Sequence, residues 1–369
     1  MTKSRVARRP RELTALDLGV SGACLASALA VCWLFFVQLT GGIGWFGYGL
    51  AVFAVYLVLL YFVTSDRFGS HVAADRVMTA VVTLFAFTVF VPLVLVIGYV
   101  VTKGWSALSL HFFVQDQRGI TPELPGSAGG GAHAIIGTLE QVGLALLFSL
   151  PLGLAVAIFL NESRSKWRRP VRIFVDAMSG LPSIVAGLFI YAVLILPYAQ
   201  HIRLLSFNGF MASLALSLTM LPTIARPVEV VLRLVPAGLR EGSLALGSSR
   251  AKTVWSVVLP TARTGIATAV VLAIARVVGE TAPLILTAFG FDLMNANPFS
   301  GPQESLPLFV FQNIRKPSAA TIARGYAGAL ALMIVVLFLF VIARIIGRDR
   351  TVRTRRRRRP AVAHEGVPA

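Results

Sequence analysis

Residues that support catalysis are scarce in this chain of 369 residues. Cys24 and Cys32 are the only cysteines, and eight positions apart on a helix they cannot form a disulfide, so we expect both to be packing residues. The five histidines are scattered, and none forms a His/Glu metal pair. No G-x-S-x-G elbow and no G-x-x-x-x-G-K-[ST] loop occurs. These absences argue against a membrane enzyme, and we expect no catalytic residue, metal or cofactor in the chain. Any energy from ATP must come from another subunit.

Acidic residues are also few, with 16 Asp and Glu against 34 Lys and Arg, which gives a formal net charge of +18. Charged residues make up 14% of the chain, hydrophobic residues 56%, and the mean hydropathy is +0.77. This composition lies outside the range of soluble globular domains. It indicates a multi-pass protein of the plasma (inner) membrane, surrounded by lipid. Nucleic acid is not an expected partner, because the basic residues lie mainly in the segments between and beyond the apolar spans, as in a membrane protein.

Eight apolar segments of roughly 18 to 25 residues are each long enough to cross a hydrocarbon core about 30 Å thick. They cover residues 18–38, 45–63, 78–101, 137–160, 172–197, 207–225, 263–289 and 321–346. If the N-terminus is inside, most Lys and Arg residues fall in the inner segments, and the outer segments hold only Lys103, Arg118, Arg203, Arg315 and Lys316. The positive-inside rule therefore predicts an all-α polytopic protein of about eight transmembrane helices with both termini cytoplasmic.

The order of the segments predicts five parts. A basic cytoplasmic N-terminus (1–17) precedes a transmembrane hairpin (18–63), a polar cytoplasmic linker (64–77), a six-span transport core (78–346) and an arginine-rich cytoplasmic tail (347–369). The run Arg355 to Arg359 favours a solvated or lipid-headgroup-binding tail, with nucleic acid or a regulatory protein as the alternative. The outer loops 102–131 and 290–320 are candidates for contact with an extracytoplasmic partner, or are simple connections.

The cytoplasmic segment 226–262 carries a spaced motif. Gly247 follows Glu241 by six positions, and Leu259 with Pro260 closes the motif. This spacing resembles the EAA signature of ABC importer permeases, E-A-A-x3-G-x9-I-x-L-P, in which a cytoplasmic helix–turn–helix docks on the ATPase subunit. Gly242 and Ser243 stand where the signature has alanines, and both keep a small side chain. The resemblance assigns ATPase coupling to these six residues, and the alternative is an ordinary amphipathic loop helix.

Charged residues inside apolar spans are expensive, and they normally face a protein interior or a water-filled path. In the seventh span, Arg276 and Glu280 lie four residues apart, and we expect them on one helical face. The pair predicts an anion site in which the planar Arg276 fork binds an oxyanion and Glu280 positions it. The alternative is a buried ion pair that sets helix packing.

A second cluster lies where the sixth span meets the cytoplasmic segment. Arg226, Glu229 and Arg233 follow one another at helical spacings of three and four. Nearby Pro222, Pro227 and Pro236 predict a bent or interrupted helix. We place Arg226 and Glu229 on the substrate path near an inner gate, with contact to lipid headgroups as an equal alternative. Near the end of the fifth span, an aspartate at position 176 is predicted to cap the span or to contact the coupling segment.

Four strings, in order, narrow the resemblance: GTLEQVGLALLFSLPLGLAVAIFLNE, GLPSIVAGLFIYAV, LREGSLALGSSRAKTVWSVVLP and ARVVGETAPL. They resemble the phosphate-specific ABC transporter permeases of the PstA/PstC type, and GETAPL is closer to the PstA form. The likeness covers about residues 78–346. It implies a six-helix type I importer core in which Arg276 and Glu280 match the charged pair of the family's translocation path, while the N-terminal hairpin and the tail lie outside it.

The resemblance also implies partners. They are a second permease of the PstC type, a cytoplasmic ATPase dimer that holds ATP-Mg, and an extracytoplasmic phosphate-binding protein. The chain is thus predicted to be the permease subunit of an ATP-driven importer of inorganic phosphate. A permease for another oxyanion, such as sulfate or molybdate, would share the coupling motif. A passive channel would have no use for it.

Overall fold

The computed structural model describes residues 15–39 and 44–346, so the basic run before residue 15 and the Arg355–Arg359 tail lie outside the described residues. Within these ranges the chain is helical, and the one β-type contact is an isolated bridge between Phe289 and Gln303. Seven helices are long and apolar enough to cross a membrane, and a bent helix pair makes an eighth candidate. The all-α polytopic prediction is confirmed. The cytoplasmic location of both termini stays a prediction.

The chain divides into two compact units, residues 1–97 and 98–369. In the first unit, α1 (Ala15–Cys32) continues as a π-helical stretch (Trp33–Leu39) and packs against α2 (Trp45–Phe68). Cys24 and Cys32 are buried and free, as predicted, and Cys32 packs with Ala28 and Val52 between the two helices. The expected polar linker at 64–77 is mostly helical. The chain turns at Gly69, whose φ of 87° suits glycine, and α3 (Ser70–Trp105) follows, with the unit boundary inside it.

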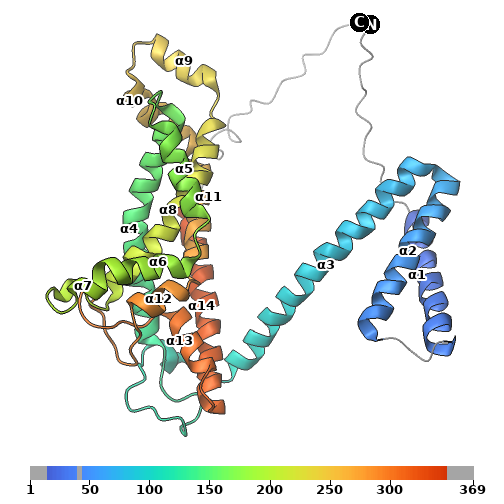
Figure 1. The fold of residues 1–369 in the computed structure, drawn as a ribbon, viewed down its shortest axis with the longest axis horizontal. Coiled ribbons are helices and arrows are strands. Elements are labelled where there is room, and N and C mark those ends of the chain that lie inside the picture. Colours follow the sequence, from blue (N-terminus) through green and yellow to red (C-terminus); the bar gives the residue numbers. More distant parts are fainter. Residues whose placement is uncertain (1–14, 40–43, 347–369) are drawn as a thin grey trace, which may run out of the picture. The chain divides into compact units, whose positions relative to one another are not determined.

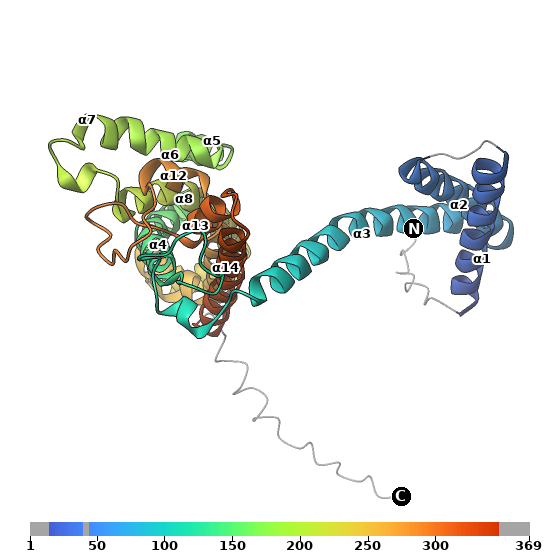
Figure 2. The ribbon, with the colours of Figure 1, turned by 90° about the horizontal axis from the view of Figure 1, so that it is seen from below.

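The second unit is a bundle built around α8 (Gly209–Arg233), as Figures 1 and 2 show. Its other long helices are α4 (Ala132–Glu162), α11 (Leu259–Val277) and α14 (Ala319–Ile346). The shorter helices are α5 (Arg168–Ser179), α6 (Ser183–Ile190), α7 (Leu196–Tyr198), α9 (Ala237–Ala245), α10 (Arg250–Thr253), α12 (Ala282–Thr287) and α13 (Leu306–Ile314). Helices α9 and α10 lie at one end, here called the coupling end, and α13 lies at the opposite end (Figure 1).

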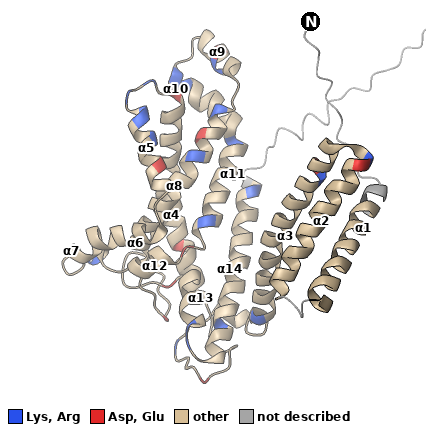
Figure 3. Cartoon of the chain, turned by 45° about the vertical axis from the view of Figure 1, so that its right-hand side comes forward, with Lys and Arg blue, Asp and Glu red and all other residues tan. Residues whose placement is uncertain are grey.

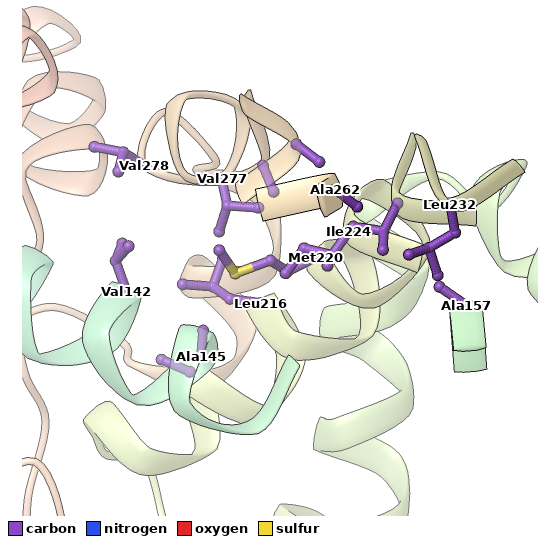
Figure 4. Packing of buried hydrophobic residues seen from close by; sticks show 14 of the residues in the cluster. Val142, Ala145, Ala157, Leu216, Met220, Ile224, Leu232, Ala262, Val277 and Val278 are labelled. Carbon is purple, nitrogen blue, oxygen red and sulfur yellow. The ribbon is translucent and has the colours of Figure 1, made fainter. Parts of the chain in front are cut away.

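Small residues let α8 approach its neighbours closely. Leu216, Met220 and Ile224 of α8 form a row of buried side chains that faces α4 and α11 (Figure 4). A Cβ on Gly153 of α4 would lie 3.0 Å from Ile224, and one on Gly265 of α11 would lie 2.4 Å from Val231 of α8. Lipid provides little hydrophobic drive between membrane helices, so this close packing supplies much of their attraction.

Two of the predicted straight spans are broken. The span expected at 172–197 is two helical segments that meet at 104°, because the helix stops at Gly180 and Pro182 lacks the N–H that a continuing helix needs. The span expected at 263–289 ends at Val277 and resumes at Ala282, interrupted by Gly279 and a proline at position 283. The two breaks meet, since α6 packs against α12 (Figure 2). By contrast, α8 continues through Pro222 and Pro227 and ends before Pro236.

At the opposite end, the loops expected at 102–131 and 290–320 are tied together. The Asp116 carboxylate accepts hydrogen bonds from the backbone N–H groups of Arg118 (3.0 Å) and Met294 (3.1 Å), and these bonds lower the pKa of Asp116 below its usual range. Gln303 is fully buried and donates to Glu140 of α4 at 2.5 Å. The second of these loops therefore lies directly on α4.

Gly137 of α4 is where this loop comes closest, because a Cβ there would lie 2.0 Å from the Glu304 carbonyl oxygen. We expect Gly137→Ala to push the loop off the helix and to destabilise the fold by roughly 1–3 kcal/mol, the usual effect of overpacking. Thermal unfolding of the purified protein in detergent measures the change. Gly143→Ala is the matched control, since a Cβ at Gly143 of the same helix meets nothing within 4 Å. Equal unfolding midpoints for the two variants would contradict the prediction.

Candidate functional site

Arg276 and Glu280 both line one cavity of about 560 Å³, here called the Arg276 cavity. Its wall comes from the break between α5 and α6, from α8 and from α11, and comprises Met178, Ser179, Leu181, Pro182, Ser183, Thr219, Pro222, Thr223, Arg226, Pro227, Leu272, Arg276 and Glu280. The two helix breaks thus open a polar space at the side of an apolar bundle.

The predicted geometry of the charged pair needs one correction. Arg276 lies in the last turn of α11, where the helix dipole favours a cation, but Glu280 follows the helix end and shares no helical face with Arg276. Glycine at 279 and the nearby proline at 283 end the helix first. Among the described residues, the Arg276 side chain has no hydrogen-bond or ion-pair partner, and it is exposed to the cavity. The two residues therefore do not form the buried ion pair of the alternative interpretation.

Hydroxyl groups complete the wall of the Arg276 cavity. The Thr219 hydroxyl donates to the Leu216 carbonyl at 2.8 Å, and the Thr223 hydroxyl donates to the Met220 carbonyl at 2.6 Å. Each hydroxyl keeps free lone pairs that can accept a hydrogen bond from a guest. These residues carry no sequence signal, because serine and threonine are common in membrane helices and only the fold brings them together.

The second cluster is an ion-pair network around Glu229, whose side chain is 2% exposed. Glu229 binds Arg226 of the same helix at 2.9 Å, it binds Arg233 at the predicted spacing of four, and it binds Arg172 of α5 at 2.5 Å. Arg226 also pairs with Asp176 of α5, so the expected cap or coupling contact of Asp176 is instead an ion pair to α8. Sequence analysis missed Arg172, which lies 57 positions before Glu229.

This network borders a second cavity of about 480 Å³ on the same side of α8. Arg226 and Pro227 line both cavities and so connect the second cavity to the first. Figure 3 shows that charged residues of the second unit gather toward α5, α9 and α10. The Glu229 carboxylate is fully engaged by arginines and holds α5 to α8, whereas the Arg276 guanidinium has no partner among the described residues.

The coupling segment forms the predicted helix–turn–helix. Helix α9 ends at a turn in which Gly247 has a φ of 82° and its N–H bonds the Leu244 carbonyl at 2.9 Å. Only glycine adopts that conformation without strain. The Ser249 hydroxyl caps α10, because it accepts a hydrogen bond from the Lys252 N–H at 3.3 Å. We call α9, this turn and α10 the coupling hairpin.

The motif residues occupy different surroundings. Glu241 and Gly242 are exposed on α9, together with the apolar side chain of Leu246. Ser243 is half-buried, and its hydroxyl lies 3.0 Å from that of Thr253 of α10, so it joins the two arms of the coupling hairpin. Leu259 and Pro260 lie inside a helical run that extends from α10 through a π-helical stretch (Val254–Val258) into α11.

Comparison with known proteins identifies the family of this chain. The model of the family "Binding-protein-dependent transport system inner membrane component" matches residues 149–352. The chain is 40% identical over 293 residues to "Phosphate transport system permease protein PstA 1" of Mycobacterium tuberculosis (strain ATCC 25618 / H37Rv), an alignment that covers 77% of this chain and 91% of the relative. It is 33% identical over 247 residues to "Phosphate transport system permease protein PstA" of Pasteurella multocida (strain Pm70). That alignment covers 66% of this chain and 84% of the relative.

A solved bacterial ABC transporter involved in the import of the acidic polysaccharide alginate shares the fold. One of its chains aligns with a TM-score of 0.54 and 17% identity, over 77% of this chain and 99% of that one. At such identity the likeness concerns the fold alone. With its candidate spans, the relatives place this chain as a multi-pass protein of the inner membrane. The chain belongs to the binding-protein-dependent transport system inner membrane components, and within that family to the PstA permeases of ABC importers.

Proposed function

We propose that this chain is the permease subunit that carries inorganic phosphate inward in an ATP-driven ABC importer. The free Arg276 guanidinium in its cavity is the observation that carries the proposal. A guanidinium presents a planar fork of donors that matches two oxygens of a tetrahedral oxyanion, and its charge is permanent. The names of the PstA relatives support phosphate as the ion.

The rest of the cavity distinguishes phosphate from other oxyanions. At neutral pH phosphate keeps at least one P–OH group, whereas sulfate and molybdate present acceptors only. Glu280 is an acceptor when ionised, and the hydroxyls of Thr219 and Thr223 have free lone pairs. A carboxylate in the same cavity as the guanidinium repels an unprotonated oxyanion and accepts a hydrogen bond from a protonated one. This chemistry favours phosphate over the sulfate or molybdate alternative.

The energy and the delivery of the ion come from partners in this proposal. The exposed Glu241 and Leu246 of the coupling hairpin fit a groove on a cytoplasmic ATPase dimer, on which ATP-Mg binds. A second permease of the PstC type completes the path, and an extracytoplasmic binding protein releases phosphate into it. Closure of the ATPase dimer on ATP pushes the coupling hairpin, the cavity opens outward, phosphate reaches Arg276, and hydrolysis returns the pair to the inward state.

The direct test is uptake of radiolabelled phosphate into vesicles that contain the complete transporter, with and without ATP, and with sulfate and molybdate as competitors. Uptake that requires ATP and that only phosphate competes supports the proposal. Uptake of another solute in place of phosphate would leave the ABC permease assignment standing and would refute the substrate.

We expect Arg276→Ala to lower phosphate uptake by about a hundredfold, because a desolvated contact to a charged ion worth roughly 3 kcal/mol is lost. Assembly should persist, since Arg276 holds no partner among the described residues. Uptake is measured in the vesicles above, and assembly by co-purification of the ATPase. Arg203→Ala, which removes an exposed arginine between α7 and α8, is the control and should transport normally. Parental uptake by Arg276→Ala would refute the anion site.

Glu280→Gln keeps the size of the side chain and removes its negative charge. We expect sulfate to become a competitor of phosphate uptake, with its inhibition constant lowered about tenfold, since the repulsion that rejects an unprotonated oxyanion is gone. Sulfate competition curves for Glu280→Gln, for its control variant and for the parent measure the shift of the inhibition constant. Glu123→Gln, at an exposed loop position, should leave the curves unchanged. If sulfate competes no better against Glu280→Gln than against the parent, Glu280 does not select the ion.

Glu241→Lys reverses a charge on the exposed face of α9. We expect it to weaken association with the ATPase by about tenfold, the effect of placing a mismatched charge at an interface. The readout is the amount of ATPase that co-purifies with the permease as the salt concentration rises. Glu123→Lys makes the same charge reversal on the exposed loop before α4 and should retain the ATPase. Equal retention by both variants would show that Glu241 lies outside the interface.

A further inference from the structure

Arg240 precedes Glu241 on α9 but points the other way. Its side chain is 22% exposed and reaches into the base of the bundle. One terminal nitrogen donates to the Leu232 carbonyl at 2.8 Å, and the other donates to the Val235 carbonyl at 3.1 Å. The first nitrogen also forms a salt bridge with Glu162 at 3.1 Å. One side chain thus connects α9 to the ends of two long helices.

The two carbonyls that Arg240 binds lie where α8 ends, and the N–H groups of Leu234 and Val235 reach the Leu232 carbonyl only in the turn after the helix. Helix α8 ends at Arg233, so Leu232 lies in its last turn and Val235 in the following bend. The last carbonyls of a helix carry a partial negative charge that a cation neutralises. Glu162 is the last residue of α4, and the Asn161 side chain holds its carboxylate at 2.6 Å. Every acceptor of Arg240 therefore lies at the end of a long helix or just beyond it.

The position of these bonds matters because the covalent connection between α8 and α9 is short and bent. Only Leu234, Val235 and Pro236 join the two helices. Such a joint transmits a pull along the chain but does not by itself fix the angle between the helices. The side chain of Arg240 bridges the joint, and its bonds tie α9 to the ends of α8 and α4.

Helix α8 is also the helix that carries the cavity hydroxyls. Thr219, Thr223 and Arg226 project from it into the Arg276 cavity. The other arm of the coupling hairpin runs through α10 into α11, which carries Arg276, and the Ser243–Thr253 contact holds the two arms together. A displacement of α10 reaches α11 through a continuous helix, whereas a displacement of α9 reaches α8 across the joint that Arg240 braces.

We propose that Arg240 is a positioning residue that locks the coupling helix α9 to the ends of α8 and α4, so that movement of the ATPase is transmitted to the substrate cavity. The inference rests on the proposed function for the direction of transport and for the partner. It assigns to Arg240 a role distinct from that of its neighbour Glu241, which contacts the partner.

The test uses the complete transporter in proteoliposomes and compares Arg240→Gln with the parent. We expect the ATPase to co-purify normally, because the exposed face of α9 is unchanged, while the phosphate imported per ATP hydrolysed falls about tenfold, a typical size for a coupling effect. Arg240→Lys should recover part of the ratio, since an ammonium keeps the charge beside Glu162 but lacks the fork that spans both carbonyls. A parental ratio in an assembled Arg240→Gln complex would overturn the proposal.

Arg164→Gln is the matched control. Arg164 follows α4 outside the coupling hairpin and lines the same small cavity of about 220 Å³ as Arg240 and Glu162, but it is exposed and its side chain has no partner among the described residues. Its variant should keep the parental ratio. If Arg240→Gln does not assemble, Arg240→Lys and Glu162→Gln, each of which removes part of the contact set, should give intermediate ratios, and parental ratios for both would refute the role.

A second readout does not depend on the substrate. Val230→Cys, introduced into a chain without Cys24 and Cys32, places a thiol at an exposed position of α8. Its rate of maleimide labelling reports movement of that helix. We expect nucleotide trapping to change this rate in the parental background and not with Arg240→Gln. Persistence of the change in Arg240→Gln would overturn the inference. Loss of the change, in a transporter that imports no phosphate, would uphold it and refute the proposed substrate instead.

Discussion

The second unit depends on one buried carboxylate. Glu229 lies in the middle of three arginines, and burying it alone in a bundle within lipid would be prohibitive. Removing one member of such a buried set typically costs about 3–5 kcal/mol, because the remaining charges are left uncompensated. The network therefore fixes α5 against α8. Since α5 is the first half of the broken span, it also fixes where the break at Gly180 faces the Arg276 cavity.

Close backbone contacts fix the second half of that break. A Cβ on Gly187 of α6 would lie 2.6 Å from the Cα of Pro283 in α12, so the two interrupted helices approach as closely as backbones allow. Each break leaves helix ends whose polar groups need partners, and irregular backbone in a membrane is tolerated where it lines a cavity or is buried in protein. The two breaks meet, and together they form one polar wall where two straight apolar helices would leave none.

Much of this could be predicted from sequence. Hydropathy located the spans because lipid imposes their length. The Glu241–Gly247 spacing indicated the coupling hairpin through its resemblance to the EAA signature, and the turn has the glycine that its conformation requires. The spacing of Arg226, Glu229 and Arg233 predicted their contacts because a helix fixes those distances. Hydropathy did not predict the bend at 180–182, because it measures how apolar a segment is and not whether the segment is straight. Glu280 was placed on a helix that Gly279 had already ended, and Arg172 lies too far along the chain for local spacing to connect it with Glu229.

The arginines of the second unit differ in whether their guanidinium groups have hydrogen-bond or ion-pair partners, and this difference distinguishes the Arg276 cavity from the rest of the bundle. Arg172, Arg226 and Arg240 each have carboxylate or carbonyl partners that belong to another helix, so each fastens two elements together. Arg276 has the same guanidinium and no such partner among the residues described. A cation at a helix end beside an apolar bundle is stable only with water or an anion next to it. The paired arginines hold the helices that form the wall, and Arg276 stays accessible in it, so that in the proposed function an anion that enters the cavity becomes its partner.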